Sequence, residues 1–295
     1  MMSLLRTMLA LLVLAPPVFA QQFRYVSFDV RGCDLTFGSG VNGRGQIVGF
    51  CIDANGNHGF LYDLKIGHSE LIDFPGATYT NAADINDRGE VVGRWNDSGG
   101  FSHGYRRDVN RDFHVVDPPT SSGCIVSNLP NVAHGINDVG DIVGRCFDAA
   151  ENEHGFMQWR DGTFELIDYP GSTTSDAWVI TNTHKVIGGD YSDTSGFVHG
   201  FIWTRSGGFQ TVDFPGALHS AIRSVTENGT ITGIYNVAGD ILHGFLVPNV
   251  TIDYPGSLSN AGTLVINNRG LVVGGYDDAT GGEHGFVAIR TPSAK

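Results

Sequence analysis

Short runs of alternating apolar and polar residues recur along this chain, and each run ends at a cluster of Gly, Pro, Asn or Asp. The segment from 70 to 105 illustrates the pattern with four such runs, at 70–74, 80–86, 90–95 and 103–105. Alternation with a period of two between turn residues is typical of half-buried β-strands. We therefore expect an all-β fold after the first 20 residues.

The tripeptide His-Gly-aromatic returns six times along the chain, and each copy has four strand-like runs, the last of which contains the tripeptide. Sequence repeats of this length are typical of β-propellers and other repeat arrays. We predict a six-bladed β-propeller of four-stranded blades, with residues 21–295 as one domain of six repeats. The repeat histidines are His58, His103, His154, His199, His243 and His284.

The order of the runs at the two ends of the chain predicts a closed ring. Residues 23–29 match the first of the four runs of a copy, and they stand alone at the start of the repeats. The last run, 284–290, is the fourth run of its copy, and no first run follows it. We expect the N-terminal strand to become the outer strand of the last blade, which removes the open ends of a linear array. An open β-solenoid is the alternative.

Two repeat positions predict a structural hydrogen bond. An Asp closes the first run of every copy, and we expect the repeat His to bond to this repeated Asp rather than to bind a metal, because six equivalent positions on a ring converge only at the axis. We also expect these carboxylates to cap amides of the following turn. The six are Asp29, Asp73, Asp117, Asp168, Asp213 and Asp253.

Glycines mark turns and close contacts in each copy. Four copies read Asp-(Phe/Tyr)-Pro-Gly, which suits a type II turn with Gly at positive φ. A second Gly lies eight residues after the Ile or Val that ends the second run, where we expect a neighbouring chain to approach closely. These glycines are Gly49, Gly93, Gly144, Gly188, Gly233 and Gly274. The aromatic residue after each His-Gly is expected in the core.

The pattern Ile-Asn-Asp-x-Gly-x-Val-Val-Gly followed by His-Gly-Phe resembles the HAF repeat of probable extracellular bacterial proteins. The segments 85–93 and 136–144 fit best, whereas Thr181 and Thr226 stand where Asn is usual. Gly also replaces the Ala that the family name implies. The resemblance covers nearly all of the chain after the first 20 residues and implies export and a propeller-like repeat. It brings no established activity and no catalytic residues.

Residues 1–20 have the pattern of a signal peptide. Arg6 precedes an apolar run at 8–14, and Val18-Phe-Ala20 forms a small-residue cleavage site. We expect a secreted or periplasmic protein that begins near Gln21 and has no stable membrane insertion. A retained membrane anchor is the alternative.

The four cysteines form two similar pairs. Cys51 and Cys146 each follow the repeat Gly by two residues, and Cys33 and Cys124 precede the second run of the same copies. In an exported chain this pattern predicts the disulfides Cys33–Cys51 and Cys124–Cys146. Four free buried thiols are the alternative.

The formal net charge is −13, and Lys and Arg are scattered singly. Nucleic acids and anionic membrane surfaces are therefore poor partners. We expect a soluble monomer.

Candidate ligand-binding residues lie in turns. Asp53, Asn55 and Asn57 alternate oxygen donors as Ca²⁺ sites do, but the distal acidic residue of such loops is missing, so we expect no cofactor and keep Ca²⁺ as a weak alternative. The third copy has an insertion at 119–130 that includes Asn128. We expect it to project over the same face as Asp53 and to form part of a binding surface.

No catalytic constellation is evident, and no Gly-x-Ser-x-Gly motif occurs. The sequence favours a non-enzymatic binding or scaffolding module for a glycan or a surface protein. The alternative is a polysaccharide hydrolase or lyase with carboxylates gathered on one face. Copy-specific acidic or histidine residues that cluster together would favour the enzyme, and His134, His184 and His219 are histidines outside the repeat pattern.

Overall fold

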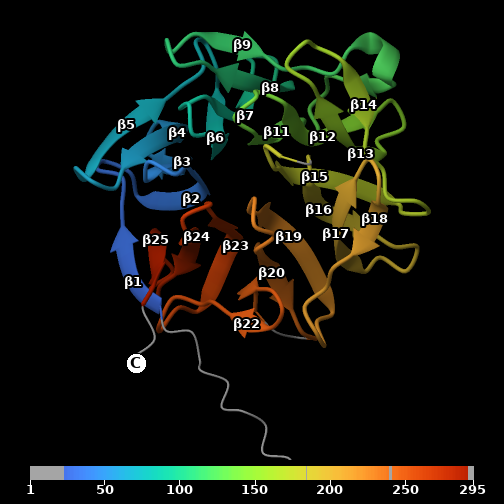
Figure 1. The fold of residues 1–295 in the computed structure, drawn as a ribbon. Helices are drawn as coiled ribbons and strands as arrows, with labels where there is room; N and C mark the ends of the chain where they lie inside the picture. Colours follow the sequence, from blue (N-terminus) through green and yellow to red (C-terminus); the bar gives the residue numbers. More distant parts are fainter. Residues whose placement is uncertain (1–22, 184, 239–240, 292–295) are drawn as a thin grey trace, which may run out of the picture.

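The computed structural model describes residues 23–183, 185–238 and 241–291, which form six antiparallel β-sheets around one axis (Figure 1). This is the six-bladed β-propeller that the sequence predicts. The first strand of each sheet lies nearest the axis and contacts the first strands of both neighbouring sheets. Within the described ranges the only helical element is a 3₁₀ turn, η1 (Thr120–Ser122).

The strands alternate in direction within each blade and follow one another from the axis outwards. Blade one has β2 (Leu35–Val41), β3 (Gln46–Asp53), β4 (Gly56–Asp63) and β5 (His68–Ile72). Blade two has β6 (Tyr79–Ile85), β7 (Val91–Asn96), β8 (Ser102–Arg107) and β9 (Phe113–Val115). Blade three has β10 (Cys124–Ile125) and β11 (Val132–Ile136), then β12 (Ile142–Asp148), β13 (Glu153–Gln158) and β14 (Phe164–Leu166). Blade four has β15 (Thr174–Ile180), β16 (Ile187–Ser192), β17 (Val198–Thr204) and β18 (Gly208–Thr211); blade five has β19 (His219–Val225), β20 (Ile231–Asn236), β21 (His243–Leu246) and β22 (Val250–Thr251); blade six has β23 (Ser259–Ile266), β24 (Leu271–Asp277), β25 (Glu283–Arg290) and β1 (Phe23–Phe28).

The N-terminal strand closes the ring. β1 pairs antiparallel with β25 over its whole length, with Phe28 opposite Gly285. The buried ring of Phe28 also stacks on Tyr62 of blade one, with centroids 4.9 Å apart. β1 therefore joins the last blade to the first, and the prediction of a closed propeller is confirmed over an open solenoid.

The alternating strand directions create two faces. The β3–β4 turn and its counterparts lie at one end of the blades, together with the connections from each outer strand to the next inner strand. We call this end the His–Asp face. The β2–β3 turn and its counterparts lie at the opposite end, which we call the Asn face.

The repeated Asn locks neighbouring blades together on the Asn face. The side-chain amide of Asn42 donates to the carbonyl oxygen of Asn86 at 3.1 Å, and Asn86 donates to that of Asn137 at 3.0 Å. Asn267 of blade six donates to the carbonyl oxygen of Asn42 at 2.8 Å, across the closure of the ring. The Asn of the repeat pattern is thus explained by architecture, because it satisfies backbone carbonyls of the next blade.

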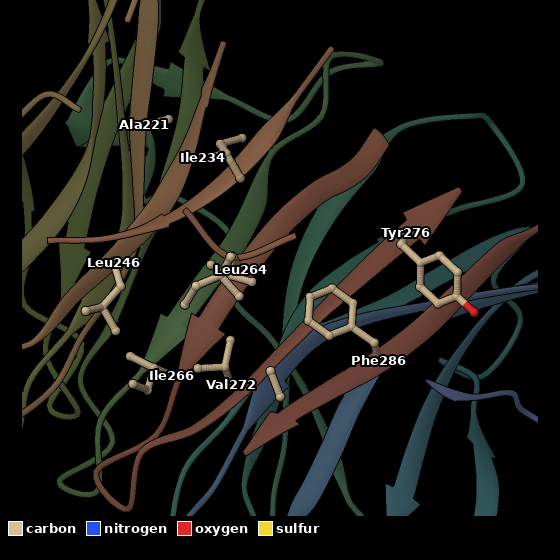
Figure 2. Close-up of a cluster of buried hydrophobic side chains, with 10 residues drawn as sticks. Ala221, Ile234, Leu246, Leu264, Ile266, Val272, Tyr276 and Phe286 are labelled. Carbon is tan, nitrogen blue, oxygen red and sulfur yellow. The ribbon is translucent and has the colours of Figure 1, made fainter. Parts of the chain in front are cut away.

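The core lies between the blades. Figure 2 shows the cluster between blades five and six, where Leu264, Val272 and Phe286 pack against Leu246 of the preceding blade. The aromatic residue after each His-Gly is buried in this way in every blade, as the sequence predicts: Phe60, Tyr105, Phe156, Phe201, Phe245 and Phe286.

The repeat glycines permit a close approach of the inner strand. A Cβ at Gly93 would lie 2.1 Å from the carbonyl oxygen of Asn81 on the paired strand. In blade four the close approach predicted at Gly188 is made by side chains, with Val179 Cγ1 2.9 Å from a Cβ placed there. The backbone contact equivalent to that of Gly93 is made by Gly189, 2.0 Å from the carbonyl oxygen of Asp176. The turn from β15 to β16 is one residue longer than its counterpart in blade two, which shifts the spacing.

The Pro-Gly turns have the predicted form, but another residue caps them. Gly76 has φ +80°, and the amide of Ala77 donates to the carbonyl oxygen of Phe74 at 3.0 Å, as in a type II turn. The amide of Phe74 donates to the Thr80 hydroxyl at 3.1 Å and not to Asp73. The carboxylate of the repeated Asp can therefore accept a hydrogen bond from the repeat histidine.

Both predicted disulfides are present, Cys33–Cys51 and Cys124–Cys146, each with Cα atoms 5.8 Å apart. In the other four blades the corresponding place holds a pair of stacked aromatic rings. Phe74 and Trp95 of blade two, for example, have centroids 3.9 Å apart. The stacks are Phe74–Trp95, Tyr169–Tyr191, Phe214–Tyr235 and Tyr254–Tyr276. In each blade, either a disulfide or an aromatic stack holds the connection that leads into the inner strand against the second strand of the blade.

Candidate functional site

Each repeat His bonds to the Asp that follows the outer strand of its own blade, and this Asp belongs to the next copy of the sequence repeat. The distance between the His Nδ1 and a carboxylate oxygen is 2.7–2.9 Å in all six pairs: His58–Asp73, His103–Asp117, His154–Asp168, His199–Asp213, His243–Asp253 and His284–Asp29. The last pair spans the ring closure. Because all blades share this pair, it belongs to the scaffold and does not distinguish one part of the surface.

Several of these histidines hold their proton more strongly than a free imidazole. Partial burial of His58 opposes protonation, but Asp73 and then Asp53 outweigh it and raise its pKa. The pKa of His199 is raised by the same balance, and that of His284 mainly by its bond to Asp29.

The turn with the candidate Ca²⁺ residues is held by its own hydrogen bonds. Asp53 Oδ1 accepts the amide of Asn55 at 2.6 Å and faces His58 Nε2 at 3.2 Å, while Oδ2 accepts the Asn55 side chain at 3.2 Å. Asn57 is the second residue of β4 and pairs with Ile52 of β3, so it lies in a strand and not in the turn. Among the described residues no group of three or more His, Cys, Asp or Glu could hold a metal ion.

The insertion of blade three lies on the His–Asp face, the same end of the ring as Asp53. Its Asn128 is exposed, and the carbonyl oxygen of the neighbouring Ser127 accepts the amide of Ser102 from blade two at 2.7 Å. The carbonyl oxygen of Pro130 accepts Arg145 Nε at 3.2 Å. The insertion is therefore anchored to two blades and to a charged residue of the site described next.

The inner strand of each of blades one to five has a β-bulge, in which one residue has no partner on the neighbouring strand. The five bulges lie at the same height along the propeller axis. Bulges re-aim side chains and are common beside functional sites. The bulge residues are Ser39, Ala83, His134, Trp178 and Arg223, and all line an axial cavity of about 110 Å³. Blades one and two thus have small residues here, whereas blades three to five have large polar or aromatic ones.

The large bulge residues form one stack. The His134 and Trp178 rings are 3.8 Å apart, and the Arg223 guanidinium lies 3.8 Å from the centroid of the Trp178 ring. Arg223 Nη1 donates to Asp190 at 2.6 Å. The three bulges therefore bring side chains of three blades into direct contact.

Charged residues beside this stack complete a set that we call the polar cluster: His134, Arg145, Glu153, Asp176, Trp178, Asp190 and Arg223. Arg145 Nη1 donates to Asp176 Oδ2 at 3.2 Å and lies 3.8 Å from Glu153. His134 Nε2 lies 3.3 Å from the same Asp176 oxygen. Ion pairs thus connect blades three, four and five. The other blades do not carry this combination of charged residues at the corresponding positions.

Burial controls the ionisation of the cluster. Burial, reinforced by Asp176, raises the pKa of Glu153 to about 7, although Arg145 opposes this. Burial also opposes the ionisation of Asp176, but His134 and Arg145 outweigh it and lower its pKa. Burial lowers the pKa of His134, so its imidazole is neutral at neutral pH. A protonatable carboxyl therefore lies beside an ionised one.

Some polar atoms of the cluster are buried without a hydrogen-bond partner in the described part of the chain. They are His134 Nε2, Asp176 Oδ1, Trp178 Nε1 and Arg223 Nε. Buried polar atoms in native proteins are normally paired, so each of these has unused capacity to donate or accept.

The sequence marked only His134 of this cluster. The missed residues lie at 145, 153, 176, 178, 190 and 223, and no motif connects them. A comparison of the six copies position by position at the bulge would have found Trp178 and Arg223, since Ser39 and Ala83 stand there in the first two copies.

No protein-family model matches the chain, and no curated protein matches it by sequence. Solved structures do match. TolB from Acinetobacter baumannii has a TM-score of 0.60 at 12% identity over 83% of this chain, which spans 64% of that protein. AofleA from Arthrobotrys oligospora has a TM-score of 0.54 at 10% identity, over 94% of this chain and 91% of that one.

The β-propeller domain of the Trilobed protease from Pyrococcus furiosus, described as having an open velcro topology, has a TM-score of 0.51 at 12% identity over 83% of this chain and 77% of that one. At such identities these likenesses show the propeller fold alone. In the present chain, β1 closes the ring by pairing with β25.

Proposed function

We propose that this protein is an exported, non-enzymatic binding or scaffolding module for a glycan or an envelope or surface protein. We place the ligand at the polar cluster and the insertion beside it. The observation that carries the proposal is the departure of blades three to five from the repeat. A scaffold needs the same residues in every blade, whereas a single binding site needs residues that differ.

The cluster has the chemistry for a polar ligand. Its carboxylates accept hydrogen bonds, its guanidinium groups donate them, and Trp178 adds an aromatic surface. Glu153, Asp190 and Arg145 keep about a fifth to a quarter of their side-chain surface exposed. Of the two ligand classes, we favour a glycan, because its hydroxyl groups both donate and accept hydrogen bonds.

Export is supported by the two disulfides, which are typical of oxidising compartments. The signal peptide expected at 1–20 lies outside the described residues. Within the described ranges, no helix has the length and apolar character needed to span a bilayer.

A thermal-shift screen of residues 21–295 against soluble glycans tests the proposal. A ligand at 100 times its Kd stabilises the folded state by about 2.7 kcal/mol. We expect a rise in Tm of several degrees with one sugar class, and loss of that rise in Asp176→Asn. The matched control is Asn81→Asp in blade two, which we expect to keep the response. No shift with any glycan would exclude the glycan ligand.

A polysaccharide hydrolase or lyase is the second candidate, and two observations favour it. The first is that copy-specific acidic and histidine residues, Glu153, Asp176 and His134, gather in one cluster. The second is a pair of carboxyl groups in different protonation states. Glu153 has a pKa of about 7 beside the ionised Asp176, and glycosidases pair a protonated carboxyl with an ionised one in this way. Release of new reducing ends from a glycan that binds, and its loss in Glu153→Gln, would establish turnover. Binding without such release would leave the non-enzymatic module.

A further inference from the structure

The charges of the polar cluster do not balance. It holds three carboxylates and two guanidinium groups. Arg145 serves both Asp176, at 3.2 Å, and Glu153, at 3.8 Å. Arg223 is engaged by Asp190 at 2.6 Å. With all three carboxyl groups ionised, this cluster of described residues would hold one negative charge more than its two guanidinium groups neutralise. Burial also raises the pKa of Asp190, although Arg223 opposes this.

The groups around Glu153 explain where this excess appears. Arg145 faces it from β12, Asp176 from β15 and Asp190 from β16, and His154 is its neighbour on β13. Burial and the two aspartates raise the pKa of Glu153 to about 7. A proton on Glu153 thus takes the place of a missing cation.

A second observation points to a ligand at the same place. Asp176 is only 2% exposed, and its Oδ1 is buried without a hydrogen-bond partner among the described residues. An unpaired buried carboxylate oxygen is costly unless something donates to it. A ligand ammonium group would supply both the donor and the missing positive charge.

We propose that the polar cluster binds a protonated amino group of its ligand, and that this ligand is a glycan with unacetylated amino sugars. The inference rests on the proposed function and names the chemical class of its ligand. The buried donors Trp178 Nε1 and Arg223 Nε favour a sugar over a lysine side chain. Sugar hydroxyls can accept from these donors, whereas a lysine ammonium only donates.

Binding of the ligand ammonium group is expected to release a proton from Glu153. An ammonium group beside Glu153 favours the ionised carboxylate, so the proton that Glu153 holds in the free protein leaves. With a pKa of about 7, Glu153 is about nine-tenths protonated at pH 6. Binding at pH 6 is therefore expected to release close to one proton per ligand.

Isothermal titration at pH 6 tests this inference on residues 21–295. A glucosamine tetrasaccharide is compared with its fully N-acetylated form, and each titration is run in two buffers with different heats of ionisation, which reports the protons released. We expect the amino form to bind at least about tenfold more tightly, a difference of about 1.4 kcal/mol. We expect proton release with the amino form only.

Glu153→Gln should abolish the proton release and reduce the preference for the amino form. The matched control is Glu283→Gln, because Glu283 precedes His284 in blade six as Glu153 precedes His154. This control should keep both properties. A thermal melt of each variant verifies folding. Asp176→Asn removes the negative charge and one of the two acceptor oxygens, and it should weaken binding of the amino form.

The outcomes separate this inference from the proposed function. Equal affinity for both tetrasaccharides, or proton release that persists in Glu153→Gln, would overturn the inference and leave a glycan-binding module. A lysine oligopeptide that binds as tightly with the same proton release would overturn the assignment to a sugar. Absence of binding by every glycan would overturn this inference and exclude the glycan ligand, and would leave a module that binds an envelope or surface protein.

Discussion

At the scale of the residue, the repeat positions serve the scaffold, and each has a distinct physical task. The repeat Gly lets two strands approach, the repeat Asn satisfies carbonyls of the next blade, and the repeat His bonds to the repeat Asp. In each case the side chain completes a backbone arrangement that would otherwise leave a polar group unpaired or two atoms in collision. Residues that differ between copies are therefore the ones left for function.

Neighbouring glycines in blade four provide a test at this scale. A Cβ at Gly189 would lie 2.0 Å from a backbone carbonyl oxygen, whereas one at Gly188 would meet methyl groups at 2.9–3.0 Å that can shift. We expect Gly189→Ala to lower the free energy of unfolding by about 3 kcal/mol and Gly188→Ala by about 1 kcal/mol. Urea denaturation measures both, and a larger loss at Gly188 would contradict the assignment of the repeat Gly.

At the scale of the element, the N-terminal strand decides whether the propeller is closed. β1 contributes Phe28, which is buried against Tyr62 of blade one, while Val26 of the same strand is 36% exposed. We expect Phe28→Ala to lower the free energy of unfolding by about 3–5 kcal/mol. The matched control Val26→Ala should change it by no more than about 0.5 kcal/mol. Similar effects of the two substitutions in chemical denaturation would argue that β1 does not close the ring.

The disulfides act on another element, the connection that enters blades one and three. Cross-links that close loops of about 20 residues contribute about 3 kcal/mol each. We expect a reducing agent to lower the Tm of the wild type by several degrees. A variant with all four cysteines replaced by Ala should melt at the lower temperature, and the reductant should not change its Tm. A wild-type Tm that is insensitive to reductant would contradict this structural role.

Much of the fold could be predicted from the sequence because its signals are local. The His-Gly period gives the number of blades, the lone run at 23–29 predicts the closure, and the matched cysteine spacing predicts both disulfides. The shift from Gly188 to Gly189 was missed because it depends on one additional residue in a turn. Spacing arguments hold only while the turns keep their length.

The polar cluster could not be predicted, because it depends on geometry that no single copy contains. Asp176 and Arg145 meet only when two blades are packed side by side, and Trp178 reaches the axis only because of a bulge. Asp53, Asn55 and Asn57 could be located as a turn, but their mutual hydrogen bonds depend on side-chain orientation. Contacts between blades carry the information that the repeat pattern lacks.

At the scale of the whole molecule, proton binding predicts how stability changes with pH. The pKa values of Asp84 and Glu153 are raised by burial to about 6 and about 7, and those of His58, His199 and His284 are also raised. A raised pKa in the folded state means that the folded protein binds more protons than the unfolded chain, so stability falls as pH rises through these values. The pKa values of Asp190 and Glu283 are raised as well. The lowered pKa of His134 acts in the opposite direction, because the folded protein then binds fewer protons than the unfolded chain, but it is one group against these several. The lowered pKa values of Asp53, Asp108, Asp148, Asp193 and Asp278 act only in the acid range.

We therefore expect the free energy of unfolding to be greatest near about pH 5 and to decrease steadily towards pH 8. Thermal melts in buffers of constant ionic strength from pH 4 to pH 8 measure this profile. Glu153→Gln should flatten the part of the decrease that lies between about pH 5 and pH 7. A stability that rises from pH 5 to pH 8 would show that these groups do not hold their protons as the structure indicates.

In this protein, the repeat residues stabilise the propeller, and we propose that the copy-specific polar cluster binds the ligand. The most direct measurement is isothermal titration of one glycan ligand into the wild type, Asp176→Asn and His103→Ala. We expect that Asp176→Asn loses binding while remaining folded, and that His103→Ala melts at a lower temperature but binds as the wild type does. Unchanged binding in Asp176→Asn, or loss of binding in a folded His103→Ala, would contradict this proposal.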